Sequence, residues 1–190
     1  MSRLSHALFE LERELGDRGV VVAESFHNGV SDSMVIERLA ELDLTASSEL
    51  IDWFAWHDGA GDPDSGLLEC ELAPGVYLWG LDLLCSEYRE IRRDLATASR
   101  GTELSSGDLW NPCWFPIARL DAGCVAVDLT DHAAESSPVL VRWFDAPPGG
   151  QEPHWTSVRA FITTLTRRYA EGVYEVGVDG KVNGPDVDRA

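Results

Sequence analysis

Apolar residues recur at helical spacing in five separate stretches of the sequence. In the first, Leu4, Leu8, Leu11 and Leu15 are four, three and four residues apart, and charged residues occupy the other faces. This is the pattern of an amphipathic helix. The later stretches begin at Ser, Thr or Asp and two of them end at Gly, as capped helices do. They start at Ser31–Ser33, at Thr45–Ser48 (with His57 on the apolar face and an end at Gly59), at Ser86, and at Thr156 or Ser157 with an end at Gly172.

Apolar and β-branched runs between these helices predict strands. They are a short run at Val20–Val22, a nearly all-apolar run at Val76–Leu84, and three consecutive runs at Trp114–Ala118, Cys124–Leu129 and Val139–Phe144. Asp179–Gly180 predicts a hairpin turn within Tyr174–Val182. Polar or Gly/Pro-rich stretches predict loops at 58–66, 98–108 and 147–150, and residues 184–190 are expected to fray.

The order of these elements predicts an α+β fold. Consecutive strands follow one another without the strict alternation of parallel βαβ units, so we expect a mostly antiparallel or mixed sheet of about four to six strands with helices packed against it. A chain of 190 residues suggests one domain.

The chain is strongly acidic, with 33 Asp and Glu against 15 Lys and Arg and a formal net charge of −18. Such a charge disfavours duplex DNA and anionic membranes as partners, because phosphates attract Lys and Arg. It is compatible with a basic protein partner. The sequence has no apolar leader, no span of transmembrane length and no CxxC among Cys70, Cys85, Cys113 and Cys124, so a cytoplasmic protein with reduced thiols is expected.

No cofactor or metal is expected, because the phosphate-binding and metal-binding motifs are missing. The loop Asp58–Gly66 resembles a calcium loop only in composition, since Pro63 and Gly66 fall at the wrong positions. Each of three residues has a catalytic and a structural interpretation. Cys113 is either a nucleophile or a buried thiol, and His57 is either a catalytic base or a packed ring that is bonded to a carbonyl. Asp128 is either a general acid or a carboxylate at the end of a strand. The structural alternative is preferred for each, and no catalytic residue is assigned.

Three central segments combine a Trp and a Pro, a short turn with Gly, and an apolar strand that ends in Asp. They are Trp114-Phe-Pro-Ile117, Asp121-Ala-Gly123 and Val125-Ala-Val-Asp128. Together with 50–59, 83–90, 155–162 and 172–174, they resemble the SUKH superfamily, which includes the SMI/KNR-type cell-wall synthesis regulators of fungi and many bacterial immunity proteins. The resemblance covers residues 33–176, although Thr45 replaces the family's usual Pro and Val158 its usual Phe. It implies that 33–176 form the core, with an extra helix and short strand in 1–32 and a hairpin and tail in 177–190.

The resemblance implies a non-catalytic protein-binding module that neutralises a toxin, possibly a nuclease, made by the same or a neighbouring bacterial cell. A regulatory protein of the same fold without a toxin partner is the first alternative, and a carboxylate-dependent hydrolase is the second. An acidic surface would steer a basic toxin toward the module. The candidate partner-binding residues, chosen by local acid density, are Asp58, Asp62, Asp64, Glu69 and Glu71.

Overall fold

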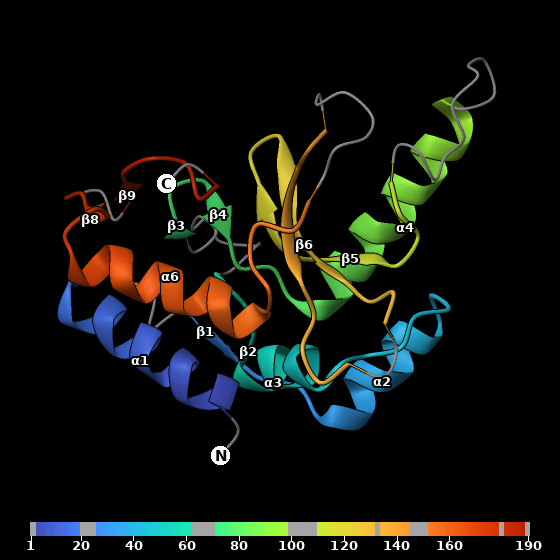
Figure 1. Cartoon of the computed structure of the whole chain (residues 1–190), viewed down its shortest axis with the longest axis horizontal. Coiled ribbons are helices and arrows are strands. Elements are labelled where there is room, and N and C mark those ends of the chain that lie inside the picture. The colour runs from blue at the N-terminus through green and yellow to red at the C-terminus, as the bar shows by residue number, and fades with distance from the viewer. Residues whose placement is uncertain are drawn as a thin grey trace.

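The computed structural model describes residues 3–19, 26–61, 71–98, 110–131, 134–144, 152–178 and 181–188. Within these ranges, helices surround a small antiparallel sheet, which confirms the predicted α+β class (Figure 1). The helices are α1 (Arg3–Asp17), α2 (Asp32–Ala40), α3 (Ser48–Trp56), α4 (Leu81–Ala98) and α6 (Val158–Ala170).

The main sheet has five antiparallel strands in the order β3-β4-β5-β6-β7. The pairing of β5 with β6 shifts register between Pro116 and Ala118, so a bulge accommodates a proline that has no N–H to donate. Two further pairs, β1 with β2 and β8 with β9, form separate small sheets. The strands are β1 (Phe26–Asn28), β2 (His57–Ala60), β3 (Glu71–Ala73), β4 (Val76–Tyr77), β5 (Trp114–Leu120), β6 (Gly123–Asp128), β7 (Val139–Trp143), β8 (Glu175–Val176) and β9 (Val182–Asn183).

Apolar side chains cover the sheet on both faces, because successive residues of a strand point to opposite sides. Val125 and Val127 of β6 belong to the main core, which also contains the apolar faces of α1, α3 and α6. Cys124 and Ala126 face the other way and pack with Trp110 in a second cluster, against which Ile91 and Leu95 of α4 lie. In Figure 1, α1 and α6 lie side by side on one side of the sheet, and α4 projects from the other.

The predicted apolar face of the first helix and three of the predicted caps are confirmed, whereas the predicted cap Ser86 is wrong, because it lies inside α4 and its hydroxyl donates to the carbonyl oxygen of Asp82. The four leucines of α1 are at most 2% exposed. The side chains of Ser31, Ser47 and Ser157 accept hydrogen bonds from backbone N–H groups in the first turns of α2, α3 and α6. The β5–β6–β7 strands and the β8–β9 hairpin also lie where the sequence predicts them.

The predicted helix through His57 is wrong at its end, because α3 stops at Trp56. His57 begins β2, which pairs with β1, so part of the predicted loop 58–66 is a strand. Gly59 has a φ of +87°, and a Cβ there would lie 2.5 Å from the backbone nitrogen of Gly80. Gly59 thus allows β2 to approach the backbone of Gly80 closely, a tertiary contact that local periodicity does not reveal.

The predicted strand Val76–Leu84 is also wrong, because β4 is only Val76–Tyr77 and α4 begins at Leu81. A short buried apolar run fits a strand or a helix equally well. The helix starts at Leu81 because the carboxylate of Asp58, 23 residues earlier, accepts a hydrogen bond of 2.7 Å from the Leu81 N–H. The short strands β1 and β3 were not predicted.

The tail is not frayed over residues 184–188. Val187 is 1% exposed, and buried Arg168 donates hydrogen bonds to the carbonyl oxygens of Asp186 and Val187. The indole N–H of Trp143 donates to Asp188 at 3.0 Å. The predicted strand at 20–22, residues 99–108 of one predicted loop, the loop at 147–150 and the turn residues Asp179–Gly180 lie outside the described residues.

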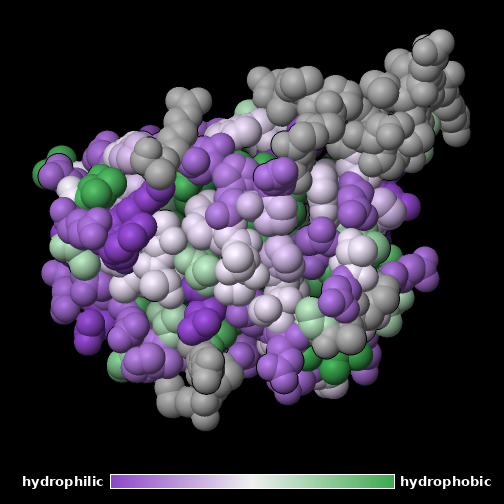
Figure 2. Space-filling view, viewed as in Figure 1, coloured by the Kyte–Doolittle hydropathy of each residue, from purple (hydrophilic) through white to green (hydrophobic). Residues whose placement is uncertain are grey.

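None of the helices in the described part of the chain has the length and apolar character needed to cross a membrane. The face shown in Figure 2 is mostly hydrophilic, and its apolar areas are small and separate.

Candidate functional site

Two of the five predicted partner-binding acids can be placed in the structure, and both accept hydrogen bonds from the backbone. Half-buried Asp58 caps α4 through the Leu81 N–H. Glu71 accepts a hydrogen bond of 2.8 Å from the N–H of Val182 and so connects β3 to β9. Asp62, Asp64 and Glu69 lie outside the described residues.

Tertiary contacts bring further acids toward Glu71. Tyr77 is its partner residue in the β3–β4 pair, and the Tyr77 hydroxyl donates a hydrogen bond of 3.0 Å to Asp121. On the other side, Val182 bonds to Glu71, and the next residue, Asn183, pairs with Glu175. We call Glu71, Asp121 and Glu175 the acidic edge.

Two carboxylates of the acidic edge, those of Glu71 and Asp121, act on Tyr77. Burial is the largest cause that raises the pKa of Tyr77 well above its ordinary value, and the hydrogen bond to Asp121 and the charge of Glu71 add to it. All three effects favour the neutral phenol over a phenolate. Glu71 and Asp121 therefore lie close enough to the Tyr77 hydroxyl to disfavour a second negative charge there.

The ion pairs of the described residues lie elsewhere. None of them includes a member of the acidic edge, whereas several acids beside α2 and α4 are paired with arginines. The pairs on this second side are Arg38 with Glu41 and Asp82, Arg89 with Glu41, Arg93 with Glu90 and Asp94, and Arg119 with Glu87. Arginines therefore offset part of the negative charge beside α2 and α4, whereas no ion pair of the described residues offsets the charge of the acidic edge.

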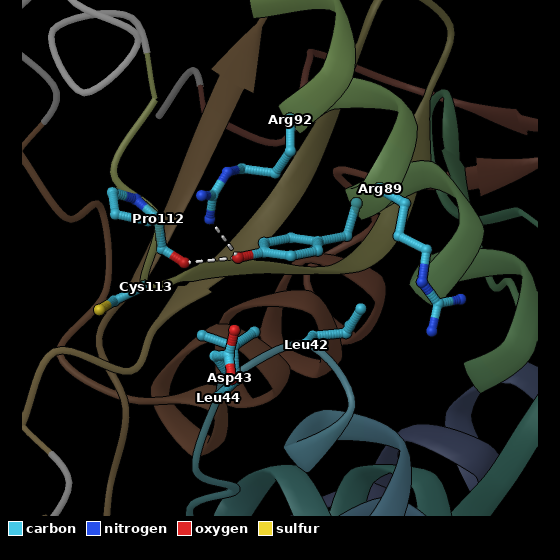
Figure 3. Close-up of a pocket in the computed structure, with 8 residues that line it drawn as sticks. Leu42, Asp43, Leu44, Arg89, Arg92, Pro112 and Cys113 are labelled. Atoms are coloured by element: carbon cyan, nitrogen blue, oxygen red, sulfur yellow. Dashed lines mark hydrogen bonds between the residues drawn. The ribbon is translucent and has the colours of Figure 1, made fainter. Parts of the chain in front are cut away.

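A pocket of about 410 Å³ opens between α4, the connection from α2 to α3, and the segment that precedes β5 (Figure 3). Its volume lies within the range of small-molecule sites. Apolar and charged side chains share its wall. The lining residues are Leu42, Asp43, Leu44, Tyr88, Arg89, Arg92, Pro112 and Cys113.

A chain of hydrogen bonds with determined directions crosses this pocket. The Tyr88 hydroxyl donates to the carbonyl oxygen of Pro112 at 2.7 Å, because a carbonyl can only accept. Its oxygen then accepts from Nη1 of Arg92 at 2.8 Å. Burial is the main cause that raises the pKa of Tyr88, while the Arg92 charge opposes the shift. The tyrosine therefore holds the guanidinium of Arg92 at the pocket.

Asp43 has an unusual backbone at the opposite side of the pocket from Arg92 in Figure 3. It is the one non-glycine residue in the described ranges with a positive φ, at 60°. Its N–H donates to the carbonyl of Ala40, and the N–H of Leu44 donates to Leu39. This is a Schellman end of α2 in which aspartate takes the position that glycine usually holds.

His57, Asp128 and Cys113, for which the sequence also allowed a catalytic role, make packing contacts and local hydrogen bonds. His57 stacks on Phe26 with ring centroids 4.2 Å apart, and its Nδ1 lies 3.0 Å from the carbonyl oxygen of His27. Asp128 accepts from the N–H and the hydroxyl of Thr130. Cys113 is half-buried, and its N–H donates to Asn111.

In the described ranges, no group of His, Cys, Asp and Glu has the arrangement needed to hold a metal ion. The sequence matches no family model and no curated protein.

Sequence reasoning missed both the acidic edge and the pocket. Asp121 and Glu175 are far from Glu71 along the chain, so local acid density could not select them. The pocket left one partial signal, since Arg89 and Arg92 are three residues apart on a predicted helix and therefore share a face. No signal in the neighbouring sequence predicted that Asp43 lies across the pocket from Arg89 and Arg92.

Proposed function

We propose that this chain is a non-catalytic protein-binding module that captures and neutralises a basic toxin domain, such as a nuclease, through its acidic edge. The observation that carries the proposal is the uneven charge compensation. Arginines pair with five acids beside α2 and α4, while Glu71, Asp121 and Glu175 converge at one edge with no ion pair among the described residues. The resemblance to the SUKH superfamily supports the choice of a toxin as the partner.

The physical argument is one of steering and contact. An uncompensated patch attracts an oppositely charged partner and can raise association rates by about 10–10³-fold, an effect that salt weakens. Apolar contact area is available on the chain around Glu175, because Val173 is 39% exposed and Val178 is fully exposed. A basic surface could meet carboxylates and apolar side chains together at this place.

The first experiment tests the function itself. Each reading frame next to this gene is expressed in a host cell with and without this chain. We expect one neighbouring product to stop growth and this chain to restore it. If no neighbouring product is toxic, or if toxicity persists in the presence of this chain, the toxin-neutralising function is wrong and a regulatory role without a toxin is favoured.

The second experiment tests the acidic edge with a charge-matched control. The edge variant carries Glu71→Gln, Asp121→Asn and Glu175→Gln, and the control carries Asp82→Asn, Glu90→Gln and Asp94→Asn on α4. The control acids are exposed and paired with arginines. Both variants lose three negative charges, at different places on the chain. Glu71→Gln and Asp121→Asn each keep a side-chain oxygen that can accept the hydrogen bonds from Val182 and Tyr77.

We expect the edge variant to associate with the toxin domain at least about tenfold more slowly at low salt, with a weaker salt dependence. The control should change the association rate by less than about twofold. Equal effects of the two variants, measured by stopped-flow fluorescence, would show that net charge rather than the acidic edge directs binding. Growth rescue could still hold in that case, so the two parts of the proposal are tested separately.

A further inference from the structure

The pocket beside Tyr88 combines a held arginine, an apolar wall and a carboxylate, which core packing does not require. We propose that it is a binding site for a small carboxylate ligand with an apolar body. This function is separate from the capture of a protein partner and does not depend on it.

Arg92 supplies the recognition group for a carboxylate. Its Nη1 donates to Tyr88, and its guanidinium carbon lies 5.7 Å from the centre of the Tyr88 ring. Among the described residues, Arg92 has no carboxylate partner, although other arginines of α4 and its surroundings do. Its remaining N–H groups are therefore available for two parallel hydrogen bonds to a ligand carboxylate, the geometry that arginine favours.

Tyr88 orients that arginine before any ligand arrives. The tyrosine is 3% exposed, and its one proton is committed to the Pro112 carbonyl. Its hydroxyl oxygen can then only accept, which suits a guanidinium and not a second acceptor. Arg89, one helical turn away, adds a second positive charge at the rim, where it is paired with Glu41 at 3.1 Å.

The rest of the wall suits an apolar body of limited size. Leu42, Leu44 and Pro112 line the pocket. In Figure 3, Pro112 lies across the pocket from Arg89, and Leu42 and Leu44 lie below these two residues. A volume of about 410 Å³ fits one small organic molecule. The ligand class is thus a carboxylate joined to a short alkyl or aryl group.

Asp43 narrows the class to ligands with a single negative charge. Its exposed carboxylate lines the same pocket and has no described cationic partner. A phosphate or dicarboxylate would place a second negative charge in its field, which is unfavourable. A monocarboxylate bound to Arg92 carries only one negative charge and so meets less of that repulsion, and an amino or hydroxyl group on the ligand could donate to Asp43.

The test uses phenylpropionate, its neutral amide phenylpropionamide, and inorganic phosphate. Binding to the full chain is measured by isothermal titration calorimetry and by amide shifts in ¹H–¹⁵N spectra. We expect phenylpropionate to bind and to shift the amides of Leu44, Arg92 and Cys113. The amide and phosphate should bind at least about tenfold more weakly, since each lacks either the charge or the apolar body.

Two matched variants assign the binding to the pocket. Arg92→Gln should weaken phenylpropionate binding by about tenfold or more, while Arg93→Gln on the same helix should leave it unchanged. Asp43→Asn should tighten it, because a like charge is removed. A ¹H–¹⁵N spectrum that matches that of the parent protein away from the substituted residue confirms that each variant is folded.

The proposal is overturned if phenylpropionate produces no shift at the pocket, if the amide binds equally well, or if Arg92→Gln and Arg93→Gln behave alike. A short peptide ending in phenylalanine, with a free or an amidated C-terminus, distinguishes two sources of the carboxylate. Tighter binding of the free-ended peptide than of phenylpropionate would support the site and assign it to a chain end. Weaker binding would support it as a site for free small molecules.

Discussion

The carboxylate of Glu49 accepts a hydrogen bond of 3.0 Å from the backbone N–H of Val158, a residue 109 positions later in the chain. The same oxygen accepts from the N–H of Ser137, and the other oxygen accepts from Arg159. Glu49 is only 8% exposed. One buried side chain of α3 therefore caps α6 and holds the segment that leads into β7, so helices and sheet meet at this group.

Replacing Glu49 should destabilise the fold. Glu49→Ala leaves three N–H groups without their charged acceptor, and we expect the free energy of unfolding to fall by about 2–4 kcal/mol. Glu49→Gln should cost less, because an amide oxygen still accepts hydrogen bonds. Urea denaturation measures both, with exposed Glu90→Gln as a control expected to stay within about 0.5 kcal/mol of the parent. An alanine variant as stable as the glutamine variant would contradict the capping role.

Removing the C-terminal tail should also destabilise the protein. A chain that ends at Asn183 loses the buried Val187 side chain, two carbonyl acceptors of Arg168 and the Asp188 acceptor of Trp143. We expect a loss of about 2–4 kcal/mol. A shorter truncation that keeps Val187 and Asp188 serves as the control. If both truncated chains unfold at the same urea concentration, the contacts of the tail do not contribute to the free energy of unfolding.

The buried thiols predict a loss of stability in alkali. Burial raises the pKa of Cys85 to about 11 and that of Cys124 to about 12, whereas a thiol in an unfolded chain titrates near ~8.5. Above that pH the unfolded chain loses protons that the folded chain keeps. The free energy of unfolding should therefore be highest below about pH 8.5 and decline toward pH 11–12, with a slope of up to about 1.4 kcal/mol per pH unit for each thiol.

Urea titrations at a series of pH values measure this slope. Cys124→Ala should reduce it, because one of the two buried thiols is gone. Cys113→Ala is the matched control, since the thiol of Cys113 is only half-buried. The prediction fails if Cys124→Ala and Cys113→Ala leave the same slope between pH 9 and 11.

The backbone of Asp43 predicts opposite effects for two substitutions. Glycine adopts a φ near 60° without steric cost, so Asp43→Gly should raise the free energy of unfolding by about 0.5–1 kcal/mol. A β-branched side chain is strained there, and Asp43→Val should lower it by more than about 1 kcal/mol. Thermal denaturation followed by circular dichroism distinguishes them. If both variants have the same melting temperature, backbone conformation does not govern this position.

Periodicity was enough to predict the elements whose signals lie within a few residues. The leucines of α1, the serine caps of α2, α3 and α6, and the β5–β6 hairpin are all encoded by neighbours in the sequence. The start of α4 was different, because its cap is Asp58. The order of the tail was missed for the same reason, since Arg168 and Trp143 hold it from distant elements.

By itself, the sequence determined the α+β class, the acidic charge and the absence of familiar cofactor and metal motifs, since each depends on composition or on spacing within one element. Only the tertiary structure decided where that charge is compensated. It gathered Glu71, Asp121 and Glu175 at one edge and set Arg92 across a pocket from Asp43. Such groupings arise from contacts between distant segments, and the packing of the whole chain sets those contacts.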